Sequence, residues 1–433
     1  MLDIKYIREH AEEVKKNCEN RGVKVDINRL LELDEKRRAK KSEVDNLRAT
    51  RNQGSKGKPS DEDIAKMRQV GDDIAKTEAE LKTIEEEYDT LVLAVPNIAS
   101  PDTPVGPDES GNVVIRTVGE IPKFDFQPKE HWELGQALGI IDTERATKVS
   151  GTRFAYLKGG LAMLEFALVQ FAFSVLTDEK ILKKIIKKVG LDVPSTPFVP
   201  VIPPVFIRPE VFQKMGRLEP KDERYYIPKD DLYLIGSAEH TLGSMHMDEV
   251  FNVEALPIRY IGFSAAFRRE AGAASKDMKG ILRVHQFDKL EMESFTRPED
   301  SLKEQDFFVA IEEYFMQELE LPYRVVAICT GDMGAPDYRQ IDIETWLPGQ
   351  NKYRETHTSD LMTDYQSRRL NIKTKIGDKT EFVHMNDATA IAMSRTPIAI
   401  MENYQQKDGS IKIPKALQKY TGFKEIKKKG LGL

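Results

Sequence analysis

The sequence predicts an α+β protein in which a long antiparallel pair of helices precedes a domain built on a mainly antiparallel sheet. Three observations predict it. Residues 67–95 carry an apolar heptad seam, strand-like runs recur after residue 225 with short turns between several of them, and neither GxGxxG nor GxxxxGK[ST] occurs. Short turns favour antiparallel pairing. The absence of both glycine motifs excludes the common Rossmann and P-loop types of nucleotide-binding site.

Residues 1–107 are predicted to form an N-terminal helical domain. Residues 1–25 have apolar side chains at helical spacing and predict one short helix ending near Gly22. A partner helix over residues 27–52 and a Gly/Pro-containing link precede the heptad seam, so we predict a helical hairpin, called the arm (residues 27–95). Ser60 is the expected N-cap of the second helix of the arm. The seam consists of Met67, Val70, Ile74, Thr77, Leu81, Ile84, Tyr88, Leu91 and Val95.

The charges of the arm are asymmetric. Residues 29–58 carry twice as many basic as acidic side chains, whereas residues 61–90 are strongly acidic. A charge run is usually a solvated face, and such a hairpin can also serve as a dimerisation rod. In a chain of net charge -6, however, contact with a phosphate backbone needs a local basic surface. The arm's basic side and tip offer Lys36, Arg37, Arg38, Lys40, Lys41, Arg48, Arg51, Lys56 and Lys58.

A second domain is predicted over residues 108–433, after a proline-rich linker. Its apolar segment FVPVIPPVFI (198–207) is interrupted by prolines, which predicts an edge or interface strand. Helical patterns occupy 161–176, 181–186 and 301–319. Strand-like runs occupy 225–227, 232–235, 258–267, 281–295, 323–329, 339–346, 353–358 and 382–385.

Residues 264–295 predict a long hairpin with two different faces. Alternation places Arg268 and Glu270 together on the first strand. On the second strand the polar face comprises Arg283, His285, Phe287, Lys289 and Glu291. Arginine forks hold phosphate oxygens and a phenyl ring can cover a base, so this face suits a nucleotide. A charged face that merely meets water is the alternative.

Composition excludes several classes of protein. With 433 residues, 40% hydrophobic and 31% charged, the chain is expected to be a soluble globular protein. Cys18 and Cys329 have no CxxC partner, which argues against a disulfide framework or a zinc site. The amino terminus lacks a signal peptide and no apolar run approaches a membrane span. A cytoplasmic protein without a membrane partner is expected.

These motifs together resemble the bacterial seryl-tRNA synthetases, which are class II aminoacyl-tRNA synthetases. FRRE (267–270) with LRVHQFDKLEM resembles motif 2 of that class. The segment around Pro204 resembles motif 1, and MSRTPIAIMENYQ, which contains Arg395, resembles motif 3. SAE (237–239) and YRETHTS (353–359) are similar to that family's TAE loop and YRE segment. The resemblance implies ATP-dependent activation of L-serine to seryl-adenylate and transfer to tRNA(Ser), with tRNA(Sec) a further candidate. It also implies a homodimer that uses Mg²⁺.

The resemblance assigns a role to each motif residue. Arg268 and Arg395 are the expected catalytic residues, and Glu355 with Thr358 would offer hard oxygens to Mg²⁺. The residues assigned to ATP are Arg268, Arg269, Glu270, Arg283, Phe287, Glu355, Thr356, His357, Thr358 and Arg395. Those assigned to serine are Ser237, Ala238, Glu239, Arg268, Glu291, Asp387 and Thr389. Those assigned to tRNA are Lys36, Arg37, Arg38, Lys40, Lys41, Arg48 and Arg51.

Some positions depart from the family pattern. Asp387 stands where an Asn is usual and is expected to add negative charge near the substrate ammonium, and Asp360-Leu361 replaces a Ser-Asn pair. Thr396-Pro397 predicts the start of a helix beside Arg395, with Thr396 as N-cap. His285 and Lys289 receive no role and are expected to be structural or rim residues. Two alternatives stay open: a paralogue that loads a carrier protein, and a non-catalytic coiled-coil protein that associates through the arm.

Overall fold

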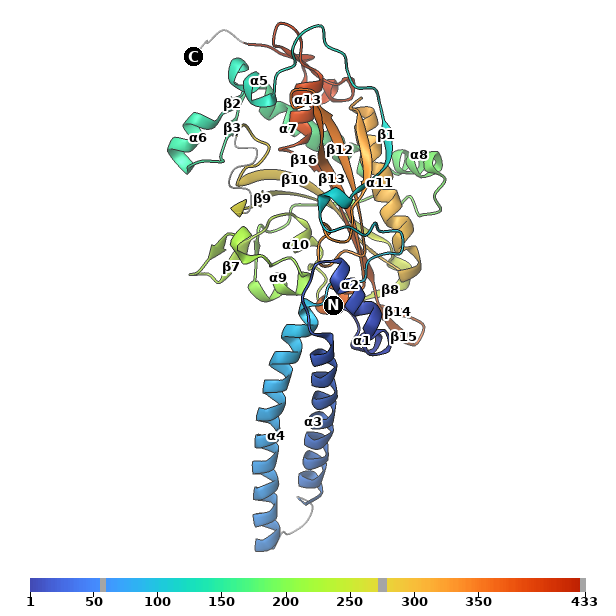
Figure 1. Cartoon of the computed structure of the whole chain (residues 1–433). Helices are drawn as coiled ribbons and strands as arrows, with labels where there is room; N and C mark the ends of the chain where they lie inside the picture. Colours follow the sequence, from blue (N-terminus) through green and yellow to red (C-terminus); the bar gives the residue numbers. More distant parts are fainter. Residues whose placement is uncertain (55–59, 272–278, 429–433) are drawn as a thin grey trace. The chain divides into compact units, whose positions relative to one another are not determined.

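A computed structural model describes residues 1–54, 60–271 and 279–428 of the chain (Figure 1). The chain divides into two compact units, Met1–Ile98 and Ala99–Leu433. The functional boundary expected after residue 107 stays a prediction. The motif 2 loop (272–278) and the arm tip with Lys56 and Lys58 lie outside the described residues.

The first unit is helical. Its opening segment is two helices, so the prediction of one helix over residues 1–25 is wrong: His10 has φ -126° and ψ 37°, which breaks the helical path between them. The long helices then follow. The four helices are α1 (Ile4–Glu9), α2 (Ala11–Asn20), α3 (Ile27–Gly54) and α4 (Asp61–Ala94).

The arm is an antiparallel pair made by α3 and α4, which confirms the coiled-coil prediction. Every residue of the α4 seam is buried or half-buried, and Leu30, Leu33 and Val44 of α3 are buried. Ser60 accepts a hydrogen bond from the Asp63 backbone N–H in a capping box, as its predicted N-cap role requires. At 1.5 Å per residue, the 34 residues of α4 span about 50 Å.

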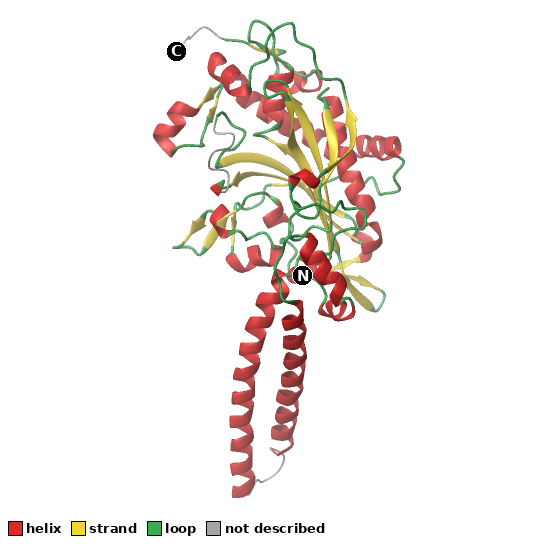
Figure 2. Cartoon of the chain, viewed as in Figure 1, coloured by secondary structure: helices red, strands yellow, loops and turns green. Residues whose placement is uncertain are grey.

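The second unit is organised by an eight-stranded sheet (Figure 2). Its neighbouring strands are antiparallel, except that the edge strand β4 runs parallel to β9. β4 contains Pro200, so the prediction of an edge strand in the proline-interrupted segment is confirmed. In spatial order the strands are β1 (Val113–Val118), β11 (Tyr323–Ala327), β12 (Arg339–Leu347), β13 (Lys352–Thr363), β16 (His384–Ala392), β10 (Gln286–Thr296), β9 (Ile258–Phe267) and β4 (Val199–Val201).

The largest core lies between one face of this sheet and three helices. These are α7 (Gly160–Leu176), α11 (Ser301–Glu318) and α13 (Thr396–Asn403), whose apolar side chains pack with Leu290 and Met292 of β10. The opposite face of β10 therefore carries the polar residues of the predicted site. The remaining helices are α5 (His131–Leu138), α6 (Thr143–Ser150), α8 (Glu179–Val189), α9 (Pro209–Met215), α10 (Glu239–Leu242), α12 (Tyr365–Leu370) and α14 (Gln418–Thr421).

Four small sheets surround the large one. They pair β2 (Ile141–Asp142) with β3 (Tyr156–Leu157); β5 (Phe206–Ile207) and β6 (Tyr226–Ile227) with β7 (Leu232–Leu234); β8 (Val250–Asn252) and β15 (Lys379–Phe382) with β14 (Lys373–Ile376); and β17 (Ile411–Lys412) with β18 (Glu425–Ile426). Among the described helices, none is long and apolar enough by itself to cross a membrane. Only α7 and α8 together, bent by 75°, match a span by length and composition.

Candidate active site

The predicted two-faced hairpin is present but shorter than expected. β9 ends at Phe267 and β10 begins at Gln286, so the prediction that Arg268, Glu270 and Arg283 lie on strands is wrong. Glu270 has φ 51°, in the left-handed region, which turns the chain away from the extended path. The Arg268 N–H still donates to the His285 carbonyl at 3.0 Å, so the two chains stay together past the strand ends.

A small cavity of about 100 Å³ lies at this end of the hairpin. It brings together residues from motifs that are far apart in the chain. The Arg268 guanidinium stands over the Phe287 ring, 5.5 Å from its centroid, and its Nε donates to the Gly236 carbonyl at 3.1 Å. Of the residues predicted for ATP and serine, the cavity is lined by Arg268, Glu270, Arg283, Phe287, Glu355, Thr356, Thr358, Thr389 and Arg395.

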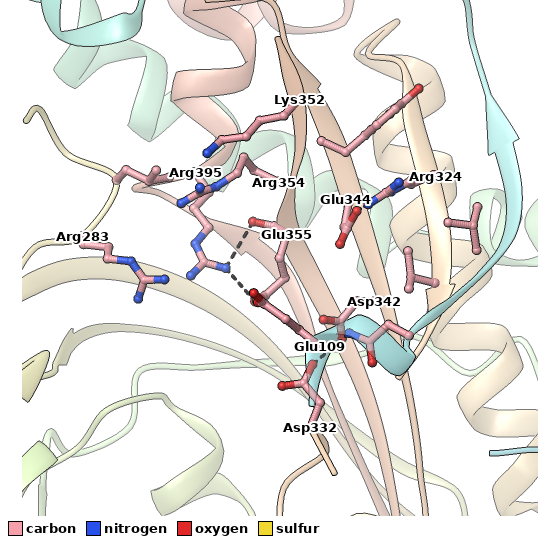
Figure 3. A pocket seen from close by; sticks show the side chains of 15 residues that line it. Glu109, Arg283, Arg324, Asp332, Asp342, Glu344, Lys352, Arg354, Glu355 and Arg395 are labelled. Carbon is pink, nitrogen blue, oxygen red and sulfur yellow. Dashed lines mark hydrogen bonds and ion pairs between the residues drawn. The ribbon is translucent and has the colours of Figure 1, made fainter. Parts of the chain in front are cut away.

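A larger cavity of about 700 Å³ adjoins the small one and shares Leu282, Arg283, Glu355 and Arg395 with it (Figure 3). Its lining is strongly charged with both signs. The cations Arg324, Lys352 and Arg354 come from β11 and β13, and Asp342 and Glu344 from β12. A hollow of this size beside the hairpin offers room for a phosphate chain or an incoming nucleic-acid end.

Two arginines predicted for phosphate contacts are paired with carboxylates. Arg395 Nη1 donates to Glu355 Oε1 at 2.6 Å and to the Glu355 carbonyl at 3.1 Å, as Figure 3 shows. Arg283 Nη1 lies 3.2 Å from Glu270 Oε2. Arg395 is itself the N-cap residue of α13, so the prediction of Thr396 as N-cap is wrong by one residue. Both guanidinium groups lie at the cavity wall, where they can exchange a carboxylate for phosphate oxygens.

The carboxylates around Glu355 suit a divalent cation. Asp342 is buried, and burial followed by the charge of Glu355 raises its pKa well above the usual range. The smaller of these two causes shows that the Glu355 charge acts on Asp342 at the cavity wall, where a cation would favour the ionised form of both carboxylates. Thr358 Oγ1 donates to Asp360 Oδ1 at 3.3 Å. Thr358 lines the small cavity, as Glu355 does. These hard oxygens fit Mg²⁺ as a ligand set.

The residues predicted for serine form a buried polar cluster next to the small cavity. Ser237 Oγ donates to Glu291 Oε2 at 3.2 Å and accepts from Lys289 Nζ at 3.2 Å. Glu239, Glu291 and Asp387 each place one carboxylate oxygen within 4.8 Å of the others. Thr389 lies opposite Glu291 in the β10–β16 register, and Ala238 immediately precedes α10. Three converging carboxylates favour a positively charged group such as an ammonium.

Ionisation differs strongly within this cluster. Burial alone would raise the pKa of Glu239, but the charge of Arg217, with smaller contributions from His240 and Lys289, holds it well below the usual range. Burial, then the charges of Glu239 and Asp360, raises the pKa of Asp387 well above the usual range. The added negative charge expected from Asp387 is therefore opposed by its protonation.

Two residues predicted for ATP line neither of the two cavities described above. Arg269 stands over the Tyr225 ring, 5.8 Å from its centroid. The imidazole of His357 is buried against Thr356 Oγ1 at 2.9 Å, and burial lowers its pKa to about 3. A buried ring that stays neutral brings no positive charge to a phosphate, and the ATP role predicted for His357 stays a prediction.

Sequence reasoning missed two cations of the cluster. Lys289 is only 5% exposed and pairs with Glu291, so of the two places expected for it, structural or rim, it takes the structural one. Arg217 lies in a loop and forms ion pairs with Glu239 and Asp387. Lys289 could have been assigned to the cluster from the sequence, because it lies on the same strand face as Glu291. The loop sequence around Arg217 contains no pattern that would indicate a place in the cluster. His285, by contrast, lies between Phe154 and Tyr225, and its Nδ1–H donates to the Arg268 carbonyl at 3.0 Å, a structural position.

On the arm, the basic residues predicted for tRNA are mostly engaged with carboxylates. Three form ion pairs from α3 to α4: Lys40 with Glu80 at 2.7 Å, Lys41 with Glu85 at 2.8 Å and Arg48 with Glu78 at 2.7 Å. Within α3, Lys36 pairs with Glu32 and Arg38 pairs with Asp34. Across the two helices, the Arg37 guanidinium covers the Tyr88 ring of α4. Arg51 is exposed in the last turn of α3.

Comparison with known proteins gives matches over the whole chain. Residues 1–99 match the seryl-tRNA synthetase N-terminal domain, and residues 223–404 match the tRNA synthetase class II core domain (G, H, P, S and T). The serine–tRNA ligase of Symbiobacterium thermophilum is 40% identical over 99% of this chain and 100% of its own length.

Two solved structures are also similar along nearly the full length. The seryl-tRNA synthetase of Pyrococcus horikoshii complexed with ATP has a TM-score of 0.87 and 39% identity, covering 99% of this chain and 100% of that one. The cytoplasmic serine–tRNA ligase of Naegleria fowleri in complex with AMP has a TM-score of 0.83 and 33% identity, with 99% of both chains covered. These relatives favour neither a carrier-protein ligase nor a non-catalytic coiled-coil protein.

Proposed function

The chain belongs to the seryl-tRNA synthetase family, and on this premise we propose that it is a serine–tRNA ligase whose small cavity binds ATP beside the Glu239–Glu291–Asp387 cluster. It activates L-serine with ATP to seryl-adenylate and transfers the seryl group to tRNA(Ser), with tRNA(Sec) as a further candidate. The observation that carries the proposal is the convergence of Arg268, Phe287 and Arg395 on one cavity next to that cluster.

The proposed first step needs position and charge rather than a protein nucleophile. The serine carboxylate attacks the α-phosphate and pyrophosphate leaves, so negative charge grows on the phosphate oxygens. Arg268 faces those oxygens and Phe287 stacks on the adenine, whose amino group donates a hydrogen bond to the Glu270 carboxylate. Arg283 and Arg395 exchange their carboxylate partners for the outer phosphates. Glu355 and Thr358 would hold Mg²⁺, and the bound ion would supply further positive charge at those phosphates.

Serine is proposed to enter the buried cluster. Its ammonium faces Glu239 and Asp387, and its hydroxyl donates to Glu291, near Ser237, Ala238 and Thr389. This arrangement is supported by two buried oxygens, Glu291 Oε1 and Asp387 Oδ1, which accept no hydrogen bond from the described residues. Buried acceptors are normally satisfied, so a substrate with several donors fits them.

The partners of the protein belong to the same proposal. The arm binds tRNA in the cytoplasm through the basic residues of α3, whose ion pairs are exposed and exchangeable. A homodimer is supported by apolar side chains exposed around the motif 1 proline, where Ile202 is 85% exposed and Val199 53%. Sedimentation at the mass of a single 49.3 kDa chain would contradict the dimer.

Serine-dependent exchange of pyrophosphate into ATP tests the proposed function. We expect exchange with L-serine, and Arg268→Ala to lower kcat/KM on the order of 10²–10³-fold, as loss of one donor to a developing anion does. Arg116→Ala is the matched control, because Arg116 lies on the edge strand β1 and pairs with Glu313 of α11. Exchange driven better by threonine, alanine or glycine than by serine would overturn the substrate assignment.

A further inference from the structure

Arg217 is held at a fixed place beside the serine cluster. It follows Gly216, which ends α9 at a φ of 72°. The Arg217 carbonyl accepts two hydrogen bonds from Arg224, from Nε at 3.2 Å and from Nη2 at 2.8 Å. Gly334 leaves room for its side chain, since a Cβ there would stand 2.7 Å from Arg217 Nη1. These contacts hold the loop in place at the point where the Arg217 side chain turns into the protein interior.

The side chain of Arg217 is 14% exposed and meets four carboxylates. Its Nε lies 3.0 Å from Glu239 Oε1. Its Nη2 lies 3.0 Å from Asp337, 3.3 Å from Asp360 and 3.5 Å from Asp387, measured to carboxylate oxygens. A planar guanidinium can spread its donors over several acceptors, whereas the ammonium of lysine is a compact point charge.

The sheet itself brings like charges together at this place. Glu293 of β10 lies directly opposite Asp387 of β16, and Asp387 lies directly opposite Asp360 of β13. Side chains of directly opposed residues share a sheet face, where like charges destabilise one another. Arg217 forms ion pairs with two members of this row and with Glu239 from α10. It therefore joins the sheet carboxylates to the helix that carries the serine loop.

The oxygens that Arg217 leaves open point to its role. Arg217 Nη2 contacts Asp387 Oδ2, while the buried Oδ1 accepts no hydrogen bond from the described part of the chain. Glu239 and Asp387 also each offer an oxygen to the space they share with Glu291. Asp387 is thus anchored through Oδ2 and keeps Oδ1 for the proposed substrate, while Glu239 is anchored through Oε1 beside the same shared space.

We propose that Arg217 is a positioning residue of the amino-acid subsite, which anchors the Glu239 and Asp387 carboxylates so that their free oxygens receive the serine ammonium. This inference rests on the proposed function. It assigns positioning of the serine subsite to Arg217 and leaves ATP binding, which depends on Arg268, Phe287 and Arg395 in the adjoining small cavity, to other residues.

The test measures KM for serine and for ATP in the exchange assay with the full chain. In Arg217→Met we expect the serine KM to rise on the order of 10–100-fold with the ATP KM within about twofold, because the carboxylates lose their shared partner. Arg217→Lys should also raise the serine KM, though less. Arg339→Lys is the matched control, since this half-buried arginine bridges Asp102 and Asp306 away from both cavities.

A double variant separates positioning from folding. Arg217→Met with Asp360→Asn removes one negative charge together with the cation, and we expect it to recover part of the lost serine affinity. If Arg217→Met does not fold, as judged by loss of ATP binding, the lysine and double variants decide. A serine KM within twofold of the unaltered protein in the folded variants, or equal rises in both KM values, overturns the inference. Failure of the unaltered protein to exchange with serine would instead overturn the proposed function.

Discussion

At the scale of single residues, Asp387 shows how environment alters a side chain's chemistry. The residue departs from the family's usual Asn, and the sequence alone indicates an extra negative charge. Burial and the neighbouring Glu239 and Asp360 raise its pKa well above the usual range, so the neutral form persists to higher pH. A protonated carboxyl resembles an amide in being neutral and in presenting both a donor and an acceptor.

This shift predicts a pH dependence for serine binding. The substrate ammonium favours ionised Asp387, so the serine KM should fall as pH rises through the raised pKa and should rise as pH falls below it. In Asp387→Asn this part of the dependence should disappear, because the amide does not titrate. The measurement is the serine KM from exchange rates across pH, with the ATP KM as internal control. An unchanged pH profile in Asp387→Asn would rule out Asp387 as the titrating group.

Most residues of the site were predictable at this scale, and a few were not. Arg268, Glu270, Arg283 and Phe287 belong to one short motif, and the structure does gather them at one cavity. Lys289 lies on the same strand as Phe287, yet the sequence predicts only a structural or rim residue there, since its place on a face does not reveal how deeply that face is buried. Burial depends on what packs against the strand, here the segment containing Ser237 and α10.

At the scale of elements, the arm combines a tight seam with exchangeable surface charges. The cross-helix ion pairs of Lys40, Lys41 and Arg48 match the excess of acid on α4 with the excess of base on α3. Exposed pairs of this kind contribute only about 0–1 kcal/mol each, so an RNA phosphate can replace a glutamate at little cost. The asymmetry of charge therefore serves both hairpin stability and the proposed tRNA contact.

A pair of substitutions tests whether these cations reach tRNA. Lys41→Gln should weaken tRNA(Ser) binding and reduce the slope of affinity against salt by about one, as loss of one phosphate contact does. Glu85→Gln frees Lys41 from its 2.8 Å partner and should leave binding equal or tighter. Filter binding at several salt concentrations measures both. Equal weakening in the two variants would mean that the ion pair only supports the hairpin.

Element boundaries were predicted well where a periodic pattern was long. The seam of α4 and the strand 258–267 match the observed elements, since heptad spacing and alternation are local properties. The prediction of one helix over residues 1–25 is wrong because His10 interrupts the helical path. The His10 ring stacks on Tyr6 with ring centroids 4.5 Å apart. The Arg283 segment failed as a strand because pairing with β9 begins only at Gln286.

At the scale of the whole molecule, the two compact units separate the proposed tasks. All cavity residues described above belong to Ala99–Leu433, whereas the basic side of α3 belongs to Met1–Ile98. Adenylate formation should therefore depend on the second unit, and selection of tRNA on the first. The functional boundary after residue 107 stays a prediction.

Shortening the arm tests this separation. Arg38 can be joined to Lys82 through a short Gly-Ser turn, which removes the distal heptads and keeps the Arg29–Glu87 and Arg37–Tyr88 contacts. We expect serine-dependent exchange within about twofold of the unaltered protein, and charging of tRNA(Ser) reduced on the order of 100-fold or more, because several phosphate contacts are lost together. Charging that survives the shortening would remove the arm from the proposed tRNA site.

The sequence by itself determined the fold class, the arm and the motif residues, because each depends on spacing within a few dozen residues. Only the tertiary structure decided which charges meet. Arg217 lies 120, 143 and 170 residues from the three aspartates that it contacts, and no local pattern marks it. Ion pairs in a buried cluster depend on distance in space and on the removal of water, and both appear only when strands and loops from across the chain come together.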